Sequence, residues 1–86
     1  MATYENLQID YNPANGGIYA LFNVGSQQYY ADIADIPYCG VECMIFKAKD
    51  DEVTDWCEEY ARRDILLSVS EKSLKDCIKE FTESLK

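Results

Sequence analysis

The chain has 86 residues, 48% of them hydrophobic and 13% aromatic, which is enough for one small core, so residues 1–86 are expected to form a single domain. Sixteen Asp and Glu against eight Lys and Arg give a formal net charge of −8, and no Lys or Arg precedes residue 47. Because nucleic acids and membrane surfaces are themselves anionic, this charge argues against direct binding to either.

The start of the chain, MATYENLQID, lacks the basic residues and apolar run of a signal peptide. No stretch approaches the roughly 18 apolar residues of a membrane span, so a cytoplasmic protein is expected. Leu7, Ile9 and Tyr11 alternate with polar residues, which is the period of a half-buried strand. NPANGG at 12–17 then predicts a tight hairpin turn, because proline fixes φ and glycine tolerates positive φ.

IYALFNV at 18–24 predicts a second strand, with Ile18 and Phe22 toward the core and Tyr19 and Leu21 on the opposite face. VGSQ at 24–27 turns the chain again. QYYADI at 28–33 predicts a third strand, and CGVECMIFKA at 39–48 a fourth one, apolar enough for the centre of a sheet. The break between these last two strands is ADIPY at 34–38, where proline lacks the donor that a central ladder needs.

A C-terminal helix is indicated by apolar residues at i, i+3, i+4, i+7 and i+11, and Ser70 is placed to cap its N-terminus. These residues are Leu74, Cys77, Ile78, Phe81 and Leu85. The expected fold is α+β, a mostly antiparallel sheet of four to five strands in a β-meander, with this amphipathic helix packed on one face.

DDEVTDWCEEY at 50–60 has two interpretations. Val53, Trp56 and Tyr60 fit helical spacing, with acids at the front and arginines behind as the helix dipole favours. The same segment also alternates as a strand does, and KDD at 49–51 would then close a hairpin from the fourth strand. Both alternatives stay open at this stage.

The second half of the chain resembles small bacteriophage and prophage proteins of unknown function, which carry an E-T-M-V-F strand followed by a W-x-E strand that ends in arginine. The resemblance covers about half the chain, Glu42 to Phe81. The matching residues are Glu42, Met44, Ile45, Phe46, Trp56, Glu58 and Arg63. It implies a phage-like origin and a strand at 52–62, and it supplies no function.

The chemistry of the side chains argues against an enzyme. The chain has no histidine, so the commonest general base and metal ligand is missing. Cys39 and Cys43 are four residues apart, about 13 Å in an extended strand, which is too far for one metal ion or a disulfide. Together with Cys77 they are predicted to be buried free thiols, and no metal or other cofactor is expected. The acids at 50–55 lack the loop pattern of a calcium site.

Two surfaces are candidates for binding a partner. The first is the acidic segment around Trp56 and Tyr60, and the second is the aromatic outer face of the sheet. The predicted partner-binding residues are Asp50, Asp51, Glu52, Asp55, Trp56, Glu58, Glu59, Tyr60, Tyr19, Leu21 and Tyr30. The alternatives are a merely solvated acidic face, a core role for Trp56, and a covered sheet face.

These observations predict a non-enzymatic domain that binds a protein with a basic surface. In its sharper form the prediction is a phage-encoded inhibitor, of the anti-defence or anti-CRISPR type, that mimics nucleic acid toward a host nucleic-acid-binding protein. One alternative is a cysteine-based, metal- or redox-responsive protein. Another is a homodimer joined through Tyr19, Leu21 and Tyr30.

Overall fold

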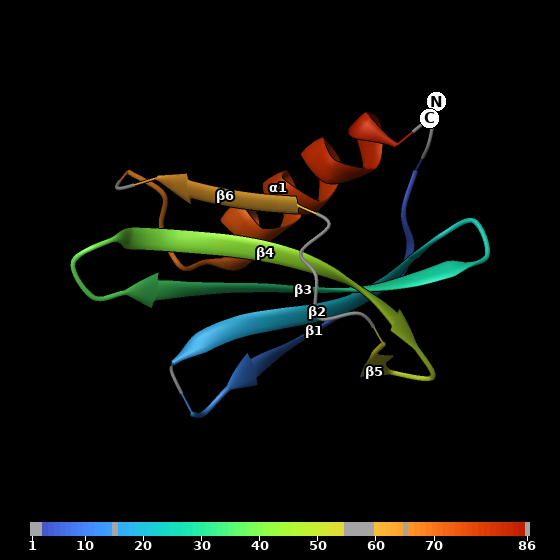
Figure 1. Cartoon of the computed structure of the whole chain (residues 1–86), viewed down its shortest axis with the longest axis horizontal. Coiled ribbons are helices and arrows are strands. Elements are labelled where there is room, and N and C mark those ends of the chain that lie inside the picture. Colours follow the sequence, from blue (N-terminus) through green and yellow to red (C-terminus); the bar gives the residue numbers. More distant parts are fainter. Residues whose placement is uncertain (1–2, 15, 55–59, 65, 86) are drawn as a thin grey trace.

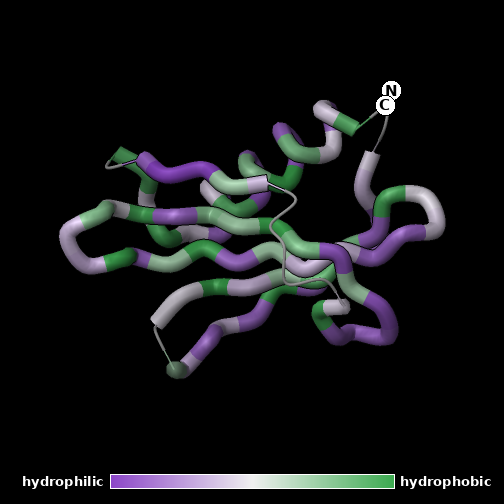
Figure 2. Tube along the Cα trace, viewed as in Figure 1, coloured by the Kyte–Doolittle hydropathy of each residue, from purple (hydrophilic) through white to green (hydrophobic). Residues whose placement is uncertain are grey.

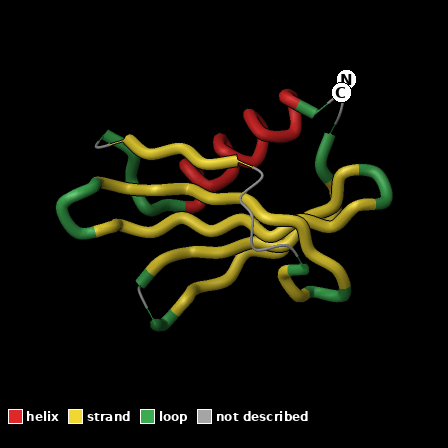
Figure 3. The backbone as a smooth tube through the Cα atoms, viewed as in Figure 1, coloured by secondary structure: helices red, strands yellow, loops and turns green. Residues whose placement is uncertain are grey.

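The fold is an antiparallel sheet with one helix lying across one of its faces (Figure 1, Figure 3). The computed structural model describes residues 3–14, 16–54, 60–64 and 66–85. The helix, α1 (Glu71–Ser84), packs against the central strands of the sheet. The expected α+β architecture is therefore confirmed.

The strands form a meander whose neighbours in sequence pair in order. They are β1 (Glu5–Asn12), β2 (Gly17–Val24), β3 (Gln27–Ile36), β4 (Gly40–Lys49), β5 (Glu52–Val53) and β6 (Tyr60–Asp64). The order is β1-β2-β3-β4-β5, and β6 pairs with β4 beside β5. The free edge of β4 is thus shared, with β6 along residues 41–45 and β5 along residues 48–49.

Turn chemistry accounts for where the strands reverse. Gly16 and Gly25 have φ of 70° and 62° in the first two turns, as the sequence predicts. Asp50 and Asp51 form a two-residue turn between β4 and β5, with φ of 52° and 68°. Positive φ at both central residues is the requirement of a type I′ turn, and aspartate tolerates it better than most residues. The hairpin closed by KDD is therefore confirmed.

The core lies between α1 and one face of the sheet. Phe22 and Tyr29 from the sheet meet Phe81 from the helix, with ring centroids 6.2 and 4.9 Å from that of Phe81. Ser70 caps the helix, its Oγ accepting the Ser73 N–H at 3.2 Å, as predicted. The helix residues that fill the core are Leu74, Cys77, Ile78, Phe81 and Thr82.

Three expectations need correction. A helix over residues 50–60 is wrong where the structure describes them, because 52–53 and 60 onward are strands. Cys39 is not a core thiol, since it lies exposed in the turn before β4. Tyr11 is 74% exposed, because it lies near the end of the edge strand β1.

Hydropathy follows this arrangement. The central strands alternate between hydrophobic and hydrophilic residues, while β6 is hydrophilic along most of its length (Figure 2). Such alternation is what a sheet with one buried face requires. Among the described residues, no helix has both the length and the apolar character needed to cross a bilayer.

Candidate functional site

Part of the acidic segment predicted to bind a partner instead stabilises the fold. Asp51 is held by Gln28, whose Nε2 donates to the Asp51 carboxylate at 2.8 Å while its Oε1 accepts the Asp51 N–H at 2.8 Å. Asp50 is the other turn residue, and Glu52 lies in β5 opposite Lys49. The paired hydrogen bonds fasten the β4–β5 turn to β3, so these acids shape the sheet.

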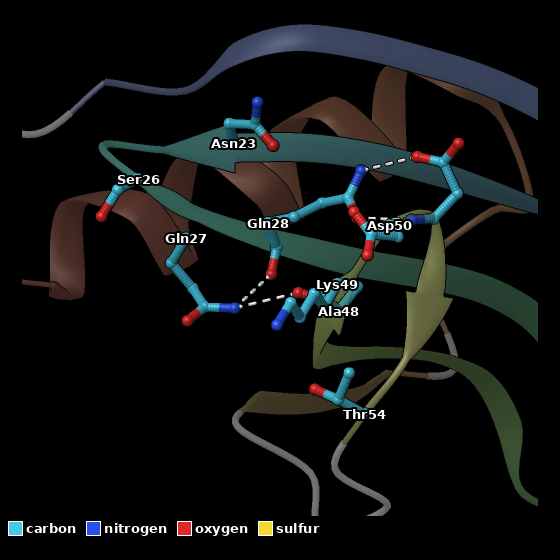
Figure 4. Close-up of a pocket in the computed structure, with 9 residues that line it drawn as sticks. Asn23, Ser26, Gln27, Gln28, Ala48, Lys49, Asp50 and Thr54 are labelled. Carbon is cyan, nitrogen blue, oxygen red and sulfur yellow. Dashed lines mark hydrogen bonds between the residues drawn. The ribbon is translucent and has the colours of Figure 1, made fainter.

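An open pocket of about 740 Å³ lies beside this turn (Figure 4). The side chain of Gln27 lines this pocket, and its Nε2 donates hydrogen bonds to the backbone oxygens of Gln28 and Ala48 at 2.8 and 3.0 Å. The amides of Gln27 and Gln28 are therefore already bonded to the protein itself. They connect the β2–β3 turn with the β4–β5 turn. Fewer of their N–H groups are therefore available to bind a ligand in the pocket.

The other end of the predicted acidic surface packs against the helix. Tyr60 begins β6, and its hydroxyl donates to the Glu80 carboxylate at 2.8 Å. Its ring meets Phe81 edge-on at 6.0 Å. Burial and the hydrogen bond to Glu80 raise the pKa of the Tyr60 phenol. Tyr60 thus extends the aromatic core. Asp55, Trp56, Glu58 and Glu59 lie outside the described residues.

The second predicted surface is the outer face of the sheet, which we define by two rows of cross-strand partners. One row is Gln8, Leu21, Tyr30 and Phe46, and the next is Asp10, Tyr19, Asp32, Met44 and Ala61. These side chains alternate with the core residues, so they lie on the side opposite α1. Among the described residues, α1 is the only helix, and it packs on the other face of the sheet.

Aromatic stacking organises the centre of this face. Tyr19 on β2 and Tyr30 on β3 are diagonal cross-strand neighbours. Their rings stack, with centroids 5.5 Å apart and an angle of 24° between the ring planes. Leu21, Met44 and Phe46 flank the stack and are half-buried. The structure therefore brings the three outer-face residues predicted from sequence into one aromatic patch, together with two further apolar side chains from β4.

Two carboxylates lie close together on this side of the sheet, Asp32 in the outer face and Glu42 in the next row. Glu42 on β4 pairs with Arg63 on β6, whereas the described residues offer the Asp32 carboxylate no hydrogen bond or ion pair. Burial, and then the charge of Glu42, raise the pKa of Asp32. Burial, Asp32 and Tyr19 raise the pKa of the Tyr30 phenol in turn. A cation placed beside Asp32 would stabilise its ionised carboxylate and so lower its pKa.

Asp32→Asn is expected to raise the free energy of unfolding at pH 7. The pKa of Asp32 is above its ordinary value of 3.8 in the folded protein, so ionisation costs folded-state stability above the folded pKa. That cost disappears as the pH falls through the folded pKa toward 3.8. Urea unfolding at pH 7 and at about pH 3 should therefore show a gain from the substitution only at the higher pH.

The matched control for this prediction is Glu83→Gln at an exposed position of α1. It removes one negative charge from the other side of the molecule and should change the free energy of unfolding by less than about 0.5 kcal/mol. An Asp32→Asn variant that is less stable than wild type at pH 7 would show that the Asp32 carboxylate has a stabilising partner.

Large apolar side chains are exposed at one end of the sheet, and the periodicity of the sequence did not predict this cluster. The β1–β2 turn, the β3–β4 turn and the segment after β6 lie at the same end (Figure 1). Tyr11, Tyr38 and Leu66 are 74%, 108% and 89% exposed there. Tyr38 also has φ of 66°, a conformation that bulky residues rarely adopt. The Pro37–Tyr38 pair was the available sequence signal, because proline favours such turns.

Two of the cysteines meet in the core. Cys43 on β4 and Cys77 on α1 are both fully buried, and each thiol has the largest effect on the pKa of the other. No group of three or more acids, cysteines or histidines suited to a metal ion occurs among the described residues. A zinc site built on the cysteines thus has no basis in the part of the chain that the structure describes.

The arrangement as a whole offers an aromatic, anionic sheet face for non-covalent contact, and a separate pair of thiols beneath the other face. No family model, curated protein or solved structure matches this chain.

Proposed function

We propose that this domain binds a protein with a basic surface through the outer face of its sheet, and that it is not an enzyme. The observation that carries the proposal is the Asp32 carboxylate, which lies beside the Tyr19–Tyr30 stack without a cationic partner among the described residues. A lysine or arginine of a partner would neutralise Asp32, and the stacked rings would supply apolar contact area.

The charge of the whole chain supports a basic partner. The two outer-face rows contain Asp10 and Asp32 and no lysine or arginine, and the next row on this side adds Glu42 paired with Arg63, within a chain of net charge −8. An anionic surface speeds encounter with a cationic one and disfavours encounter with nucleic acid or anionic lipid. Aromatic rings surrounded by charge also resemble the centre and rim of protein interfaces.

A homodimer through the same face is the less favoured alternative. A two-fold dimer would place each patch against its own copy, which would bring Asp10 and Asp32 of one chain close to the same acids of the other. Like charges facing each other across a partly buried interface are destabilising. Light scattering at high protein concentration tests this alternative, and a dimer that Tyr30→Ser dissociates would support it against a basic partner.

The sharper form of the proposal is a phage-encoded inhibitor that presents its acidic face to the nucleic-acid groove of a host protein. Its support is the net charge, the absence of any lysine or arginine before residue 47, and the resemblance of residues 42–81 to small phage proteins. A groove that binds phosphates is rich in lysine and arginine, so a protein surface with carboxylates can compete for it.

The test begins with capture from a nuclease-treated bacterial lysate on immobilised protein, followed by purification of the captured protein and direct titration. Asp32→Lys is expected to weaken that binding at least tenfold, because it turns the central anion into a cation. Glu83→Lys is the matched control, since it makes the same charge change on the exposed side of α1 and should leave affinity within about twofold.

Two further results decide between surfaces. Tyr38→Ser removes the most exposed ring of the loop end and should leave affinity unchanged. If Tyr38→Ser abolishes binding while Asp32→Lys does not, the contact is the loop end and the outer-face proposal is wrong. For the inhibitor form, the captured protein should bind nucleic acid, and an oligonucleotide should displace this domain from it.

A further inference from the structure

A pair of thiols joins the helix to the sheet. Cys43 lies on the helix-facing side of β4, and Cys77 lies in the apolar stripe of α1. Both are 0% exposed and belong to the same core cluster. Each thiol is the group with the largest effect on the pKa of the other, so the two side chains are neighbours across the helix–sheet interface.

A cation lies at the edge of this pair. Arg62 is the register partner of Cys43 on β6, so it lies on the helix-facing side of the sheet, and its charge acts on the Cys77 thiol. Arg62 also forms ion pairs with Glu80 at 3.2 Å and with Asp64 at 3.8 Å. The Cys43 thiol and, less strongly, the Arg62 charge lower the pKa of Cys77 against the opposing effect of burial, and the thiolate is the form of cysteine that reacts with oxidants.

The opposite direction holds for Cys43. The interaction with Cys77 and burial raise the pKa of Cys43, the direction opposite to that of Cys77. Cys77 is therefore the more easily ionised of the two, which suits it to react first, with Cys43 as the resolving cysteine. The two cysteines are therefore unequal, although both are buried.

We propose that Cys43 and Cys77 form an intramolecular disulfide when the protein meets a peroxide, so that this domain carries an oxidisable staple between β4 and α1. The Cys77 thiolate attacks one peroxide oxygen, the O–O bond breaks, and a sulfenic acid forms as hydroxide leaves and takes up a proton. The Cys43 sulfur then attacks the Cys77 sulfur, the S–O bond breaks, and water leaves with the Cys43 proton. Two thiols are oxidised, and one hydrogen peroxide is reduced to two waters.

Access for the oxidant comes through the edge of the sheet. Both sulfurs are covered in the closed fold, and β6, which carries Arg62, pairs only with β4 among the described residues. Opening of an edge strand requires less free energy than global unfolding, so we expect a slow reaction that still occurs in the native protein. The product would close a loop of residues 43–77, which restricts the unfolded chain.

The chain has four cysteines, and the fourth is Cys57. The experiment therefore uses Cys39→Ser/Cys57→Ser, which leaves only the proposed pair. After exposure to hydrogen peroxide under native conditions and removal of the oxidant, the expected result is an intact mass lower by about 2 Da. A non-reducing digest should give one linked species containing the peptides of Cys43 and Cys77. The midpoint of thermal unfolding should rise by about 10 °C and return to its starting value with a reductant.

Two controls keep the result decisive. Wild-type protein treated in parallel shows that the oxidant is active, because its exposed Cys39 should be modified. Adding Cys43→Ala to the double variant should abolish the mass loss, and the Cys77 sulfenic acid should then be trapped by dimedone. An unchanged mass of the double variant while wild-type Cys39 reacts, or oxygen addition to either sulfur without a link, would overturn the proposal.

This proposal stands apart from the binding function. The thiol pair lies on the helix side of the sheet, and the outer face lies on the other side. Failure of the disulfide to form would leave the Asp32→Lys prediction untouched, and loss of the outer-face proposal would leave the mass shift expected.

Discussion

Phe81→Ala is expected to lower the free energy of unfolding by about 3–5 kcal/mol, the largest effect of any single change considered. Phe81 is 2% exposed and is the aromatic centre of the core. Its ring meets Phe22, Tyr29 and Tyr60 at centroid distances of 6.2, 4.9 and 6.0 Å. Removing it leaves a cavity where α1 contacts three strands, and a domain of 86 residues has little stability in reserve.

The measurement is urea unfolding followed by circular dichroism, with Phe81→Leu as the matched variant. Leucine keeps most of the buried apolar volume and should cost clearly less than alanine, while losing the edge-on ring contacts. If Phe81→Ala unfolds outright in water, the leucine variant still supplies a number. Equal stability of Phe81→Ala and wild type would mean that α1 does not pack on the sheet through this residue.

Ala31→Leu is expected to destabilise the domain by about 1–3 kcal/mol through overpacking. Ala20 and Ala31 are register partners on β2 and β3, both 0% exposed, on the face that α1 covers. Because these two adjacent alanines have small side chains, the helix can pack close to this part of the sheet. Three additional carbon atoms at Ala31 have no room, so the helix must shift or the side chain must leave its preferred rotamer.

Thermal and urea unfolding measure this effect, and Ala14→Leu is the control, because Ala14 is exposed in the β1–β2 turn. The control should change the free energy of unfolding by less than about 0.5 kcal/mol. An Ala31→Leu variant as stable as the control would indicate a loosely packed core with unfilled space above Ala31. Reduced exchange protection of α1 amides in the Ala31 variant would identify the helix as the element that moves.

The two faces of the sheet respond to substitution in opposite ways, and this contrast separates folding from binding. On the helix face, Phe81 and Ala31 are expected to affect stability. On the outer face, Asp32→Asn is expected to improve stability at neutral pH, while Asp32→Lys is expected to weaken binding of the proposed basic partner. A gain in stability with a loss of binding at one residue would match the usual conflict between function and stability.

Local sequence was enough to predict much of the fold. Alternation along 18–24 placed Ile18 and Phe22 in the core, because the period of a strand assigns each residue to a face. Glycine and proline marked the turns through their φ preferences. The helix from Glu71, its Ser70 cap and its buried stripe followed from the 3.6-residue period. Tyr19, Leu21 and Tyr30 were assigned to the outer face by the same argument.

The path of residues 50–64 was decided by tertiary structure. Alternation and helical spacing fit this segment equally well, and the free edge of β4, which exists only once β3 and β4 have paired, accepts β5 and then β6. The bonds of Gln28 to the Asp51 turn also join residues 23 positions apart. Such pairings depend on contacts distant in sequence, which no local period encodes.

The cysteines show most clearly which features follow from the sequence alone and which depend on tertiary structure. Spacing along the chain excluded a link between Cys39 and Cys43 and suggested that both were core thiols, yet Cys39 lies exposed in a turn. Cys43 instead meets Cys77, which is 34 positions away, and Arg62 lies beside them. By itself the sequence determined which residues face inward within each element, because that is a matter of period. Only the packing of α1 on β4 decided which inward residues touch, because contact depends on how elements are placed in space.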